Sequence, residues 1–123
     1  MINGKIAWWE IRVPDLARAQ AFYTTVFGAG TQQFDQYLML LDADGQPFGA
    51  LEQTDDAVAT DGWMRTYFAT DELEVILDRI TAAGGSIEHD RALISEEFGW
   101  WAVARDPFGN WLGLCTSVPP AAG

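Results

Sequence analysis

Two adjacent tryptophans and a glutamate open the stretch "WWEIRVPDLARAQAFYTTVFG" (8–28). Side chains alternate along a strand, so Trp8 and Glu10 share one face, and the more apolar pair Trp9 and Ile11 shares the other. We expect the apolar face to pack beneath a helix. On the other face, a carboxylate at Glu10 is a candidate general base, and the indole of Trp8 is a flat wall for planar or cationic groups.

Further candidate side chains lie in the second half of the chain. Alternation in "WMRTYFAT" (63–70) places Arg65 and Tyr67 on one face, and Trp111 begins the run "WLGLCTS". Trp100 and Trp101 follow "SEEFG", so one of them points to each side of a strand. In an enzyme, Glu10 would be the base and Arg65 would stabilise an oxyanion without a metal. The alternatives are a Glu10–Arg65 ion pair without a ligand role and aromatic side chains that only pack.

Several other kinds of chemistry have no support in the sequence. Cys115 is the one cysteine, which excludes an intramolecular disulfide and a cysteine-based zinc cluster. It is interpreted as a small buried apolar residue, because no base is placed near it. The one histidine, His89, is expected in a surface loop. No nucleophile–base pair, P-loop or dinucleotide fingerprint occurs.

The charge balance is strongly acidic, with 18 Asp and Glu against 7 Lys and Arg and a net charge of -11. Such a surface repels phosphates, so nucleic-acid binding is disfavoured. No apolar run approaches the length of a membrane helix, and "MINGKIAWWE" does not resemble a signal peptide. We therefore expect a single domain over residues 1–123, located in the cytoplasm, with no membrane partner.

Two helical patterns must position these side chains. An apolar stripe with helical spacing runs from Asp15 to Gly28, and a second runs over the same distance from Asp71 to Gly84. Asp15 is a good N-cap residue and Gly28 a good stop. Asp71 with Glu74 three residues later predicts a capping box.

The two halves also share a hairpin signature. "LDADGQPFG" (41–49) resembles "RDPFGNWLG" (105–113), which aligns Gly49 with Gly113. Both predict a turn between two strands. The second half is longer, and we expect its extra residues in 90–99, where no pattern predicts a long element. The predicted parts are a first βαβββ module (4–53), a linker (54–62) and a second βαβββ module (63–117). Strands are expected at 5–13, 31–34, 37–42, 47–53, 63–70, 86–90, 100–106 and 111–117.

This layout, together with the sequence motifs "VPDLARAQAFYTTVFG" and "DPFGNWLGL", resembles that of the vicinal oxygen chelate superfamily. That superfamily includes glyoxalase I, the bleomycin-resistance proteins and the extradiol dioxygenases. The resemblance implies an α+β fold of two tandem βαβββ modules, which form a cupped mixed sheet with one helix per module on the outside. It also implies a homodimer.

The resemblance further implies where a metal would be held. Members that use a metal take one ligand from the first strand and one from the last strand of each module. Here those positions hold Trp8, Gly49, Arg65 and Gly113, with Met64 in place of Arg65 if the register slips by one residue. The indole of Trp8, the two glycines and the guanidinium of Arg65 offer no electron pair to a divalent ion. We therefore expect no metal and no cofactor.

The side chains expected to line the cup are instead aromatic, with one charge of each sign. The sequence thus predicts a metal-independent protein of the bleomycin-resistance type that binds a small planar or amphipathic ligand. The alternatives are a glyoxalase-like lyase, isomerase or dioxygenase, and a non-catalytic dimeric interaction domain. The predicted ligand-binding residues are Trp8, Glu10, Arg65, Tyr67, Trp101 and Trp111.

Overall fold

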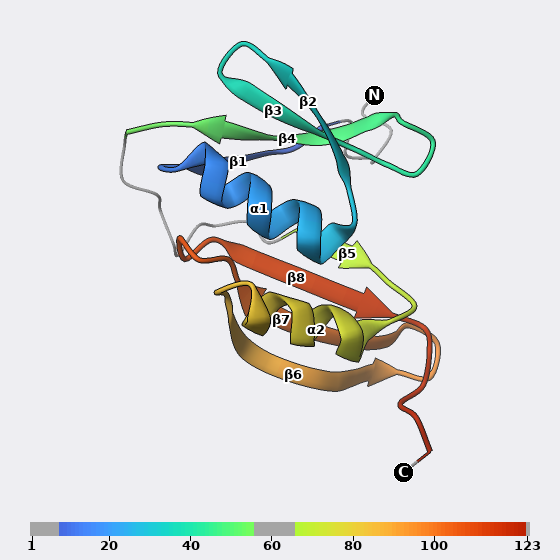
Figure 1. Ribbon diagram of the computed structural model, residues 1–123. Coiled ribbons are helices and arrows are strands. Elements are labelled where there is room, and N and C mark those ends of the chain that lie inside the picture. Colours follow the sequence, from blue (N-terminus) through green and yellow to red (C-terminus); the bar gives the residue numbers. More distant parts are fainter. Residues whose placement is uncertain (1–7, 56–65, 123) are drawn as a thin grey trace, which may run out of the picture. The chain divides into compact units, whose positions relative to one another are not determined.

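The computed structural model describes residues 8–55 and 66–122 (Figure 1). Within these ranges the chain forms two compact units, each with one four-stranded mixed sheet and one helix. Both units follow the order strand, helix, strand, strand, strand. The predicted α+β fold with two βαβββ modules and one helix per module is confirmed.

The first module contains one helix, α1 (Leu16–Phe27), and a sheet in the order β1-β4-β3-β2 (Figure 1). Strand β1 runs parallel to β4, and the other neighbours are antiparallel. The described strands are β1 (Glu10–Val13), β2 (Gly30–Phe34), β3 (Tyr37–Leu41) and β4 (Pro47–Gln53).

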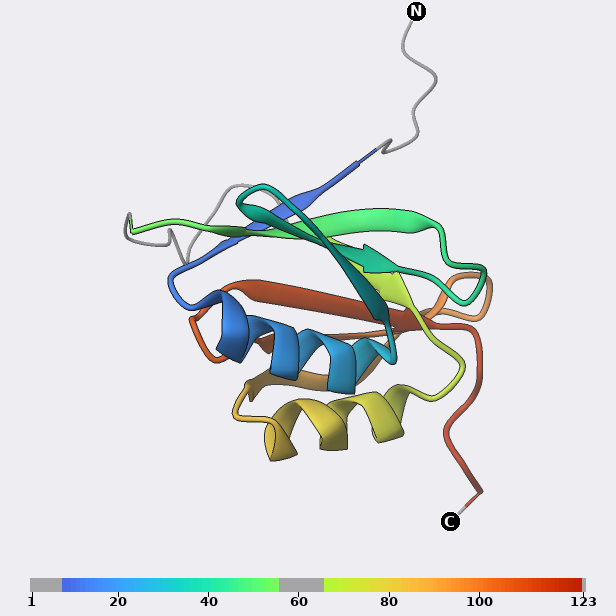
Figure 2. The ribbon, with the colours of Figure 1, turned by 45° about the horizontal axis from the view of Figure 1, so that its top comes forward.

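The second module repeats this plan with the sheet order β5-β8-β7-β6 and the helix α2 (Leu73–Ala82). Again the first and last strands, β5 and β8, are parallel neighbours. In both views the helix of each module lies along one face of its own sheet (Figures 1 and 2). The described strands are β5 (Tyr67–Ala69), β6 (Ser86–Ser95), β7 (Gly99–Arg105) and β8 (Trp111–Thr116).

Helix α1 begins and ends as predicted. The Asp15 carboxylate accepts a hydrogen bond from the backbone N–H of Arg18 (3.0 Å), which satisfies a donor that the first turn leaves free. Gly28 ends the helix with φ 68°, a left-handed conformation that glycine adopts at little cost. The amide of Gln53 in β4 also accepts from Leu16 N (2.9 Å), so the helix start is tied to the sheet.

Helix α2 begins one residue later than predicted. Its N-cap is Glu72, without a side-chain capping bond, so the capping box from Asp71 to Glu74 is not formed. Instead the Thr70 hydroxyl accepts from Glu72 N (3.0 Å). The Glu74 carboxylate forms an ion pair with Arg91 of β6 instead (2.6 Å).

The extra residues of the second half do lie largely within 90–99, but they form part of a long strand, which was not expected. Strand β6 continues to Ser95, and a short turn then leads into β7. Its pairing with β7 is interrupted by three register shifts, which break the period-two pattern that identifies a strand. His89 therefore lies in a strand, although its side chain is exposed as expected.

Each module buries its core between its helix and its sheet. In the first module, Ala19, Phe22, Tyr23 and Val26 of α1 are buried with Leu38, Leu40 and Leu51. In the second, the stripe of α2 is buried with Ala102, Ala104, Leu112 and Leu114. These positions leave one face of each sheet uncovered by the helix of its own module, and the described candidate site residues lie there.

Some predictions fall outside the described residues. These include Arg65, most of the linker 54–62 and the first part of the strand expected at 63–70. The module boundaries therefore stay predictions. Within the described residues, no helix has the length and apolar character needed to cross a bilayer.

Candidate functional site

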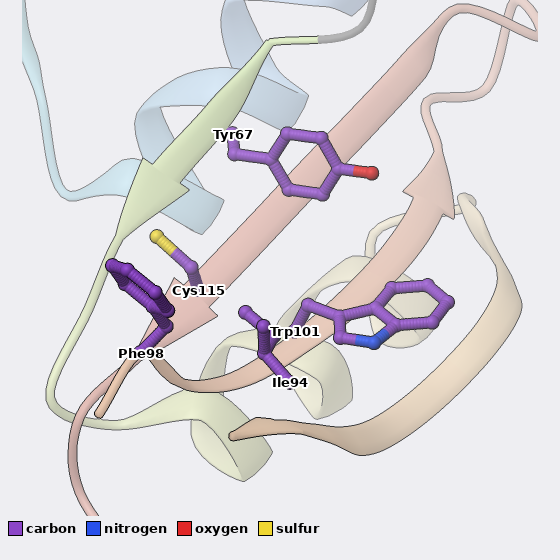
Figure 3. Close-up of a pocket in the computed structure, with 5 residues that line it drawn as sticks. All are labelled: Tyr67, Ile94, Phe98, Trp101 and Cys115. Carbon is purple, nitrogen blue, oxygen red and sulfur yellow. The ribbon is translucent and has the colours of Figure 1, made fainter. Parts of the chain in front are cut away.

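A cavity of about 540 Å³ lies within the second module, in the size range of small-molecule sites. It is lined by Tyr67, Ile94, Phe98, Trp101 and Cys115 (Figure 3). Three of these five side chains are aromatic and none is charged. Three segments supply the three rings, which spread around the smaller side chains of Ile94 and Cys115 (Figure 3). The lining can therefore hold a planar or apolar group.

Strand register places Tyr67, Trp101 and Cys115 on one face of the sheet. Tyr67 of β5 pairs with Gly113 of β8, and Trp101 of β7 pairs with Cys115 of β8. Paired residues point to the same side of a sheet, and positions 113 and 115 differ by two. The intervening Leu114 is buried on the helix side. This face is the one that alternation predicts for Tyr67, Gly113 and Cys115.

Gly113 gives the Tyr67 ring room to lie against the sheet. A Cβ atom at position 113 would lie 2.6 Å from Cδ1 of Tyr67 and 2.7 Å from the backbone oxygen of Thr66. Contacts this short do not occur in relaxed proteins, so a larger residue at position 113 would displace the phenol ring. The absence of a side chain at Gly113 therefore fixes one wall of the cavity.

Ile94 and Phe98 are cavity residues that the sequence analysis did not identify. Ile94 lies near the end of β6, and Phe98 lies in the turn before β7. Both are unusually exposed for apolar side chains. The signal was present in "LISEEFG", where large apolar residues flank two glutamates. The sequence analysis assigns no long element to residues 90–99, so it gives these two side chains no face of a sheet.

Of the two adjacent tryptophans, Trp101 lies on the open face of the sheet, the face not covered by the helix of its module, and its indole has a second neighbour. The imidazole of His89 lies 4.3 Å from the Trp101 ring centre with a tilt of 30°. Nδ1 of His89 is 2.7 Å from the backbone oxygen of Asp90, an acceptor, so this nitrogen carries the proton. The stacked imidazole supports the Trp101 ring at the edge strand β6.

Trp111 lies on the same face but does not line the cavity. The guanidinium of Arg105 stacks over its ring at 3.7 Å. Arg105 is held there by the Glu88 carboxylate (2.8 Å) and the backbone oxygen of Gly109 (2.8 Å). This arrangement favours a packing role for Trp111 over the predicted ligand contact.

The open face of the first module carries the other predicted residues. Trp8 and Glu10 lie there, and the indole N–H of Trp8 donates to the Glu10 carboxylate at 3.4 Å. Arg12 and Glu52, on paired positions of β1 and β4, form an ion pair at 3.3 Å. The expected partner of Glu10, Arg65, lies outside the described residues.

Tyr37 joins this group of charges from β3, where it pairs with Glu52. A hydrogen bond to the Glu52 carboxylate, followed by the negative charge of that carboxylate, raises the pKa of the Tyr37 phenol. Glu10 and Asp35 contribute further in the same direction. The open face of this module is thus polar, in contrast to the apolar cavity of the second module.

Gly49 does not lie on the open face, which corrects the alignment with Gly113. A register shift between Leu40 and Leu41 bulges β4, and a Cβ atom at Gly49 would meet the ring of Trp9. Trp9 lies on the helix side, where it contacts Phe48 (5.7 Å). The residue equivalent to Gly113 is Ala50, because the two N–H groups make the same hydrogen bond. The N–H of Ala50 donates to the backbone oxygen of Trp9, just before β1, and the N–H of Gly113 donates to that of Thr66, just before β5. One inserted residue reverses which side chains face outward.

The residues at the expected metal positions do not fit a metal. Among the described positions, Trp8 offers only an indole donor, Ala50 offers a methyl group, and Gly113 is covered by the Tyr67 ring. Within residues 8–55 and 66–122, no three His, Cys, Asp or Glu side chains converge into a group able to hold a metal ion. The chemistry of the donor set thus disagrees with the metal that the superfamily often uses.

The fold agrees with a comparison against protein families. Residues 5–114 match the model of the Glyoxalase/Bleomycin resistance protein/Dioxygenase superfamily. The chain belongs to this superfamily, as the resemblance in the sequence implied. A comparison with curated proteins gives no match.

Solved structures with the same fold are similar over nearly their whole length. The fosfomycin resistance protein FosX from Listeria monocytogenes, complexed with Mn(II) and sulfate, has a TM-score of 0.75 at 19% identity, covering 96% of this chain and 93% of that one. A glyoxalase-related enzyme from Fulvimarina pelagi has a TM-score of 0.72 at 18% identity, covering 92% and 88%. The hypothetical protein SA1046 from S. aureus has a TM-score of 0.68 at 17% identity, covering 93% and 98%. At these identities the likeness shows the fold.

Proposed function

We propose that the chain is a metal-independent small-molecule binding protein that holds a planar or amphipathic ligand in the cavity of its second module. The observation that carries this proposal is the lining by Tyr67, Phe98 and Trp101 around about 540 Å³. Flat aromatic walls bind planar groups by stacking and by burying apolar area, each contact contributing roughly 0.5–1.5 kcal/mol. Tyr67 and Trp101 are two of the predicted ligand-binding residues.

Metal independence is supported by the side chains at the superfamily's ligand positions. FosX is a relative described with Mn(II), yet this chain has indole, methyl and hydrogen in the described positions. A ligand would therefore be held by stacking and shape instead of by coordination. Trp8, Glu10 and Trp111 are not part of the cavity lining, so the proposal does not depend on them.

The test is binding of N-phenyl-1-naphthylamine, an uncharged planar dye that fluoresces in apolar surroundings. Phe98→Ala removes one wall and should weaken dye binding about tenfold, the effect of losing one buried aromatic contact. Phe34→Ala is the matched control, because Phe34 in β2 is equally exposed (66% against 67%) and does not line the cavity. Equal affinity in both variants would refute the proposed site.

A second measurement addresses the metal. The dye is titrated into protein treated with a chelator and into protein supplied with Mn²⁺, Ni²⁺ or Zn²⁺. We expect the same affinity in all samples and no stoichiometric metal in the purified protein. Dye binding that depends on one of these ions would overturn metal independence while leaving the cavity in place.

We also propose that the chain forms a homodimer, as the resemblance to the superfamily implies. The large apolar side chain of Leu93 supports this proposal, because it is 58% exposed in the chain alone. Sedimentation velocity measures the mass directly. A species of 13.6 kDa at all accessible concentrations would refute the dimer.

A further inference from the structure

The cavity has a lining that distinguishes between classes of ligand. We propose that it selects weakly hydrated organic cations, such as quaternary ammonium groups, over uncharged compounds of the same shape. The inference rests on the proposed function, since it concerns the same cavity. It names the ligand class from the charge distribution around Tyr67, Phe98 and Trp101.

The rings supply the first part of the attraction. The face of an aromatic ring carries partial negative charge, so a cation over several rings is bound by each of them. Three of the five lining side chains are aromatic, and none of the five is a lysine or arginine that would oppose a cation. A pocket of this kind is the usual receptor for a quaternary ammonium group.

The surroundings of the cavity are acidic as well. Glu96 and Glu97 are exposed and lie in the turn that joins the lining residues Ile94 and Phe98. Over the described residues of the module there are nine acidic side chains against three arginines. Two of those arginines, Arg91 and Arg105, are paired with Glu74 and Glu88. The negative charge of this turn attracts an approaching cation at distances shorter than the Debye length, beyond which salt screens the charges.

The lining also explains why the cation should lack N–H groups. Among the described residues no carboxylate lines the cavity, so a primary ammonium beside these five side chains would leave hydrogen-bond donors without strong acceptors. A quaternary ammonium has no N–H to satisfy and loses less hydration on entry. The polar atoms present are the Tyr67 hydroxyl, the Trp101 indole nitrogen and the Cys115 thiol.

The test compares two compounds of the same shape that differ in charge, 3-hydroxyphenyltrimethylammonium and 3-tert-butylphenol. Binding is measured by calorimetry or by displacement of N-phenyl-1-naphthylamine. We expect the ammonium to bind about three- to tenfold more tightly, a preference in the range of cation–π contacts. Raising the salt concentration to about 0.5 M should remove only part of this preference, because short contacts are screened least.

Substitutions separate the ring effect from the charge effect. Phe98→Leu keeps an apolar side chain but removes the ring, so it should weaken ammonium binding severalfold and leave 3-tert-butylphenol nearly unchanged. The double change of Glu96→Gln and Glu97→Gln should weaken ammonium binding only at low salt. Phe34→Leu is the control for a ring outside the cavity. Far-ultraviolet circular dichroism and urea titration verify that each variant is folded.

The outcomes distinguish this inference from the proposed function. If 3-tert-butylphenol binds as tightly as the ammonium, selection for cations is refuted and the cavity remains a binding site. If neither compound binds while the naphthylamine dye does, the inference is also refuted. If no compound binds, both proposals fail. A preference for the ammonium that disappears in Phe98→Leu supports the inference.

Discussion

The phenol ring of Tyr67 in β5 lies over Gly113 in β8, in the space that any side chain at position 113 would need. The superfamily resemblance places a metal ligand at this same position. The two residues thus exclude a donor from the last strand and at the same time form a wall of the cavity. This packing links the loss of the expected ligand to the aromatic character of the proposed site.

Gly113→Ala should lower the free energy of unfolding by about 1–3 kcal/mol, because the new methyl group overlaps the Tyr67 ring and the Thr66 backbone oxygen. Urea titration measures the loss. Gly30→Ala in β2 is the control, since its new methyl group would meet Leu41 at an ordinary distance of 3.6 Å. Adding Tyr67→Ala should recover only part of the stability, because the backbone oxygen stays in place. A neutral Gly113→Ala would contradict the packing described here.

Gly49→Ala should also be destabilising, by a similar amount of about 1–3 kcal/mol, for a reason specific to the first module. The ring of Trp9 occupies the space beside Gly49. It contacts the ring of Phe48, which in turn contacts Phe27 of α1. A double-mutant cycle with Trp9→Leu tests the contact. We expect the cost of Gly49→Ala to be much smaller once the indole is gone. The same cost in both backgrounds would show that the ring is not the obstacle.

Arg91→Met should cost about 1–2 kcal/mol, because Arg91 joins three parts of the second module through hydrogen bonds. It bonds Glu74 of α2 twice (2.6 and 2.8 Å), donates to the backbone oxygen of Val118 (2.8 Å) and lies over the Trp100 ring. Arg79→Met, on an exposed position of α2, serves as the control. Thermal or urea unfolding that does not separate the two variants would argue against this role.

The Arg91–Glu74 pair also has a predictable pH dependence. The hydrogen bond from Arg91 lowers the pKa of the Glu74 carboxyl below its ordinary value of 4.5. A carboxyl with a lowered pKa stabilises the fold above the ordinary value, and this contribution is lost as the pH falls through the folded value. The stability difference between wild type and Arg91→Met should therefore shrink in acid. Because Glu74 is well exposed, we expect the carboxylate's share to be under about 1 kcal/mol.

Tyr37 should ionise above the ordinary phenol pKa of 10.0, because Glu52 accepts its hydrogen bond and repels the phenolate. Its contribution to stability is complete below the ordinary value and is lost as the pH rises through the folded value. Glu52→Gln should return the pKa toward 10.0, as followed by tyrosinate absorbance. Glu10→Gln acts only through charge and should lower the pKa less. Equal effects of the two substitutions would contradict the dominant role of the Glu52 hydrogen bond.

Much of the fold could be predicted from local patterns. The apolar stripe from Leu16 to Phe27 and its two ends at Asp15 and Gly28 are local features, because a helix bonds residues that are close in the chain. The strand at 47–53 was predicted with its observed bounds, and Tyr67 was assigned to the correct face. Alternation succeeded wherever pairing is regular.

The failures in the strands share one cause, which is irregular pairing between the two strands of a hairpin. The bulge that turns Gly49 toward Trp9 depends on how β4 meets β3. The extension of β6 to Ser95 depends on β7, which supplies the hydrogen bonds that its sequence pattern does not indicate. The predicted capping box fails for a separate reason, because Glu74 pairs with Arg91 of β6 instead of bonding the helix start.

The sequence by itself determined the superfamily, the two βαβββ modules and the lack of donor atoms at Trp8 and Gly113, because these depend on residue types and spacing along the chain. Only the tertiary structure decided which aromatic rings line a cavity. Ile94 and Phe98 join Tyr67, Trp101 and Cys115 there, whereas Trp111 packs beneath Arg105. Cavities form where side chains from separate strands fail to fill the space between them, and that outcome depends on the whole packed arrangement instead of any single segment.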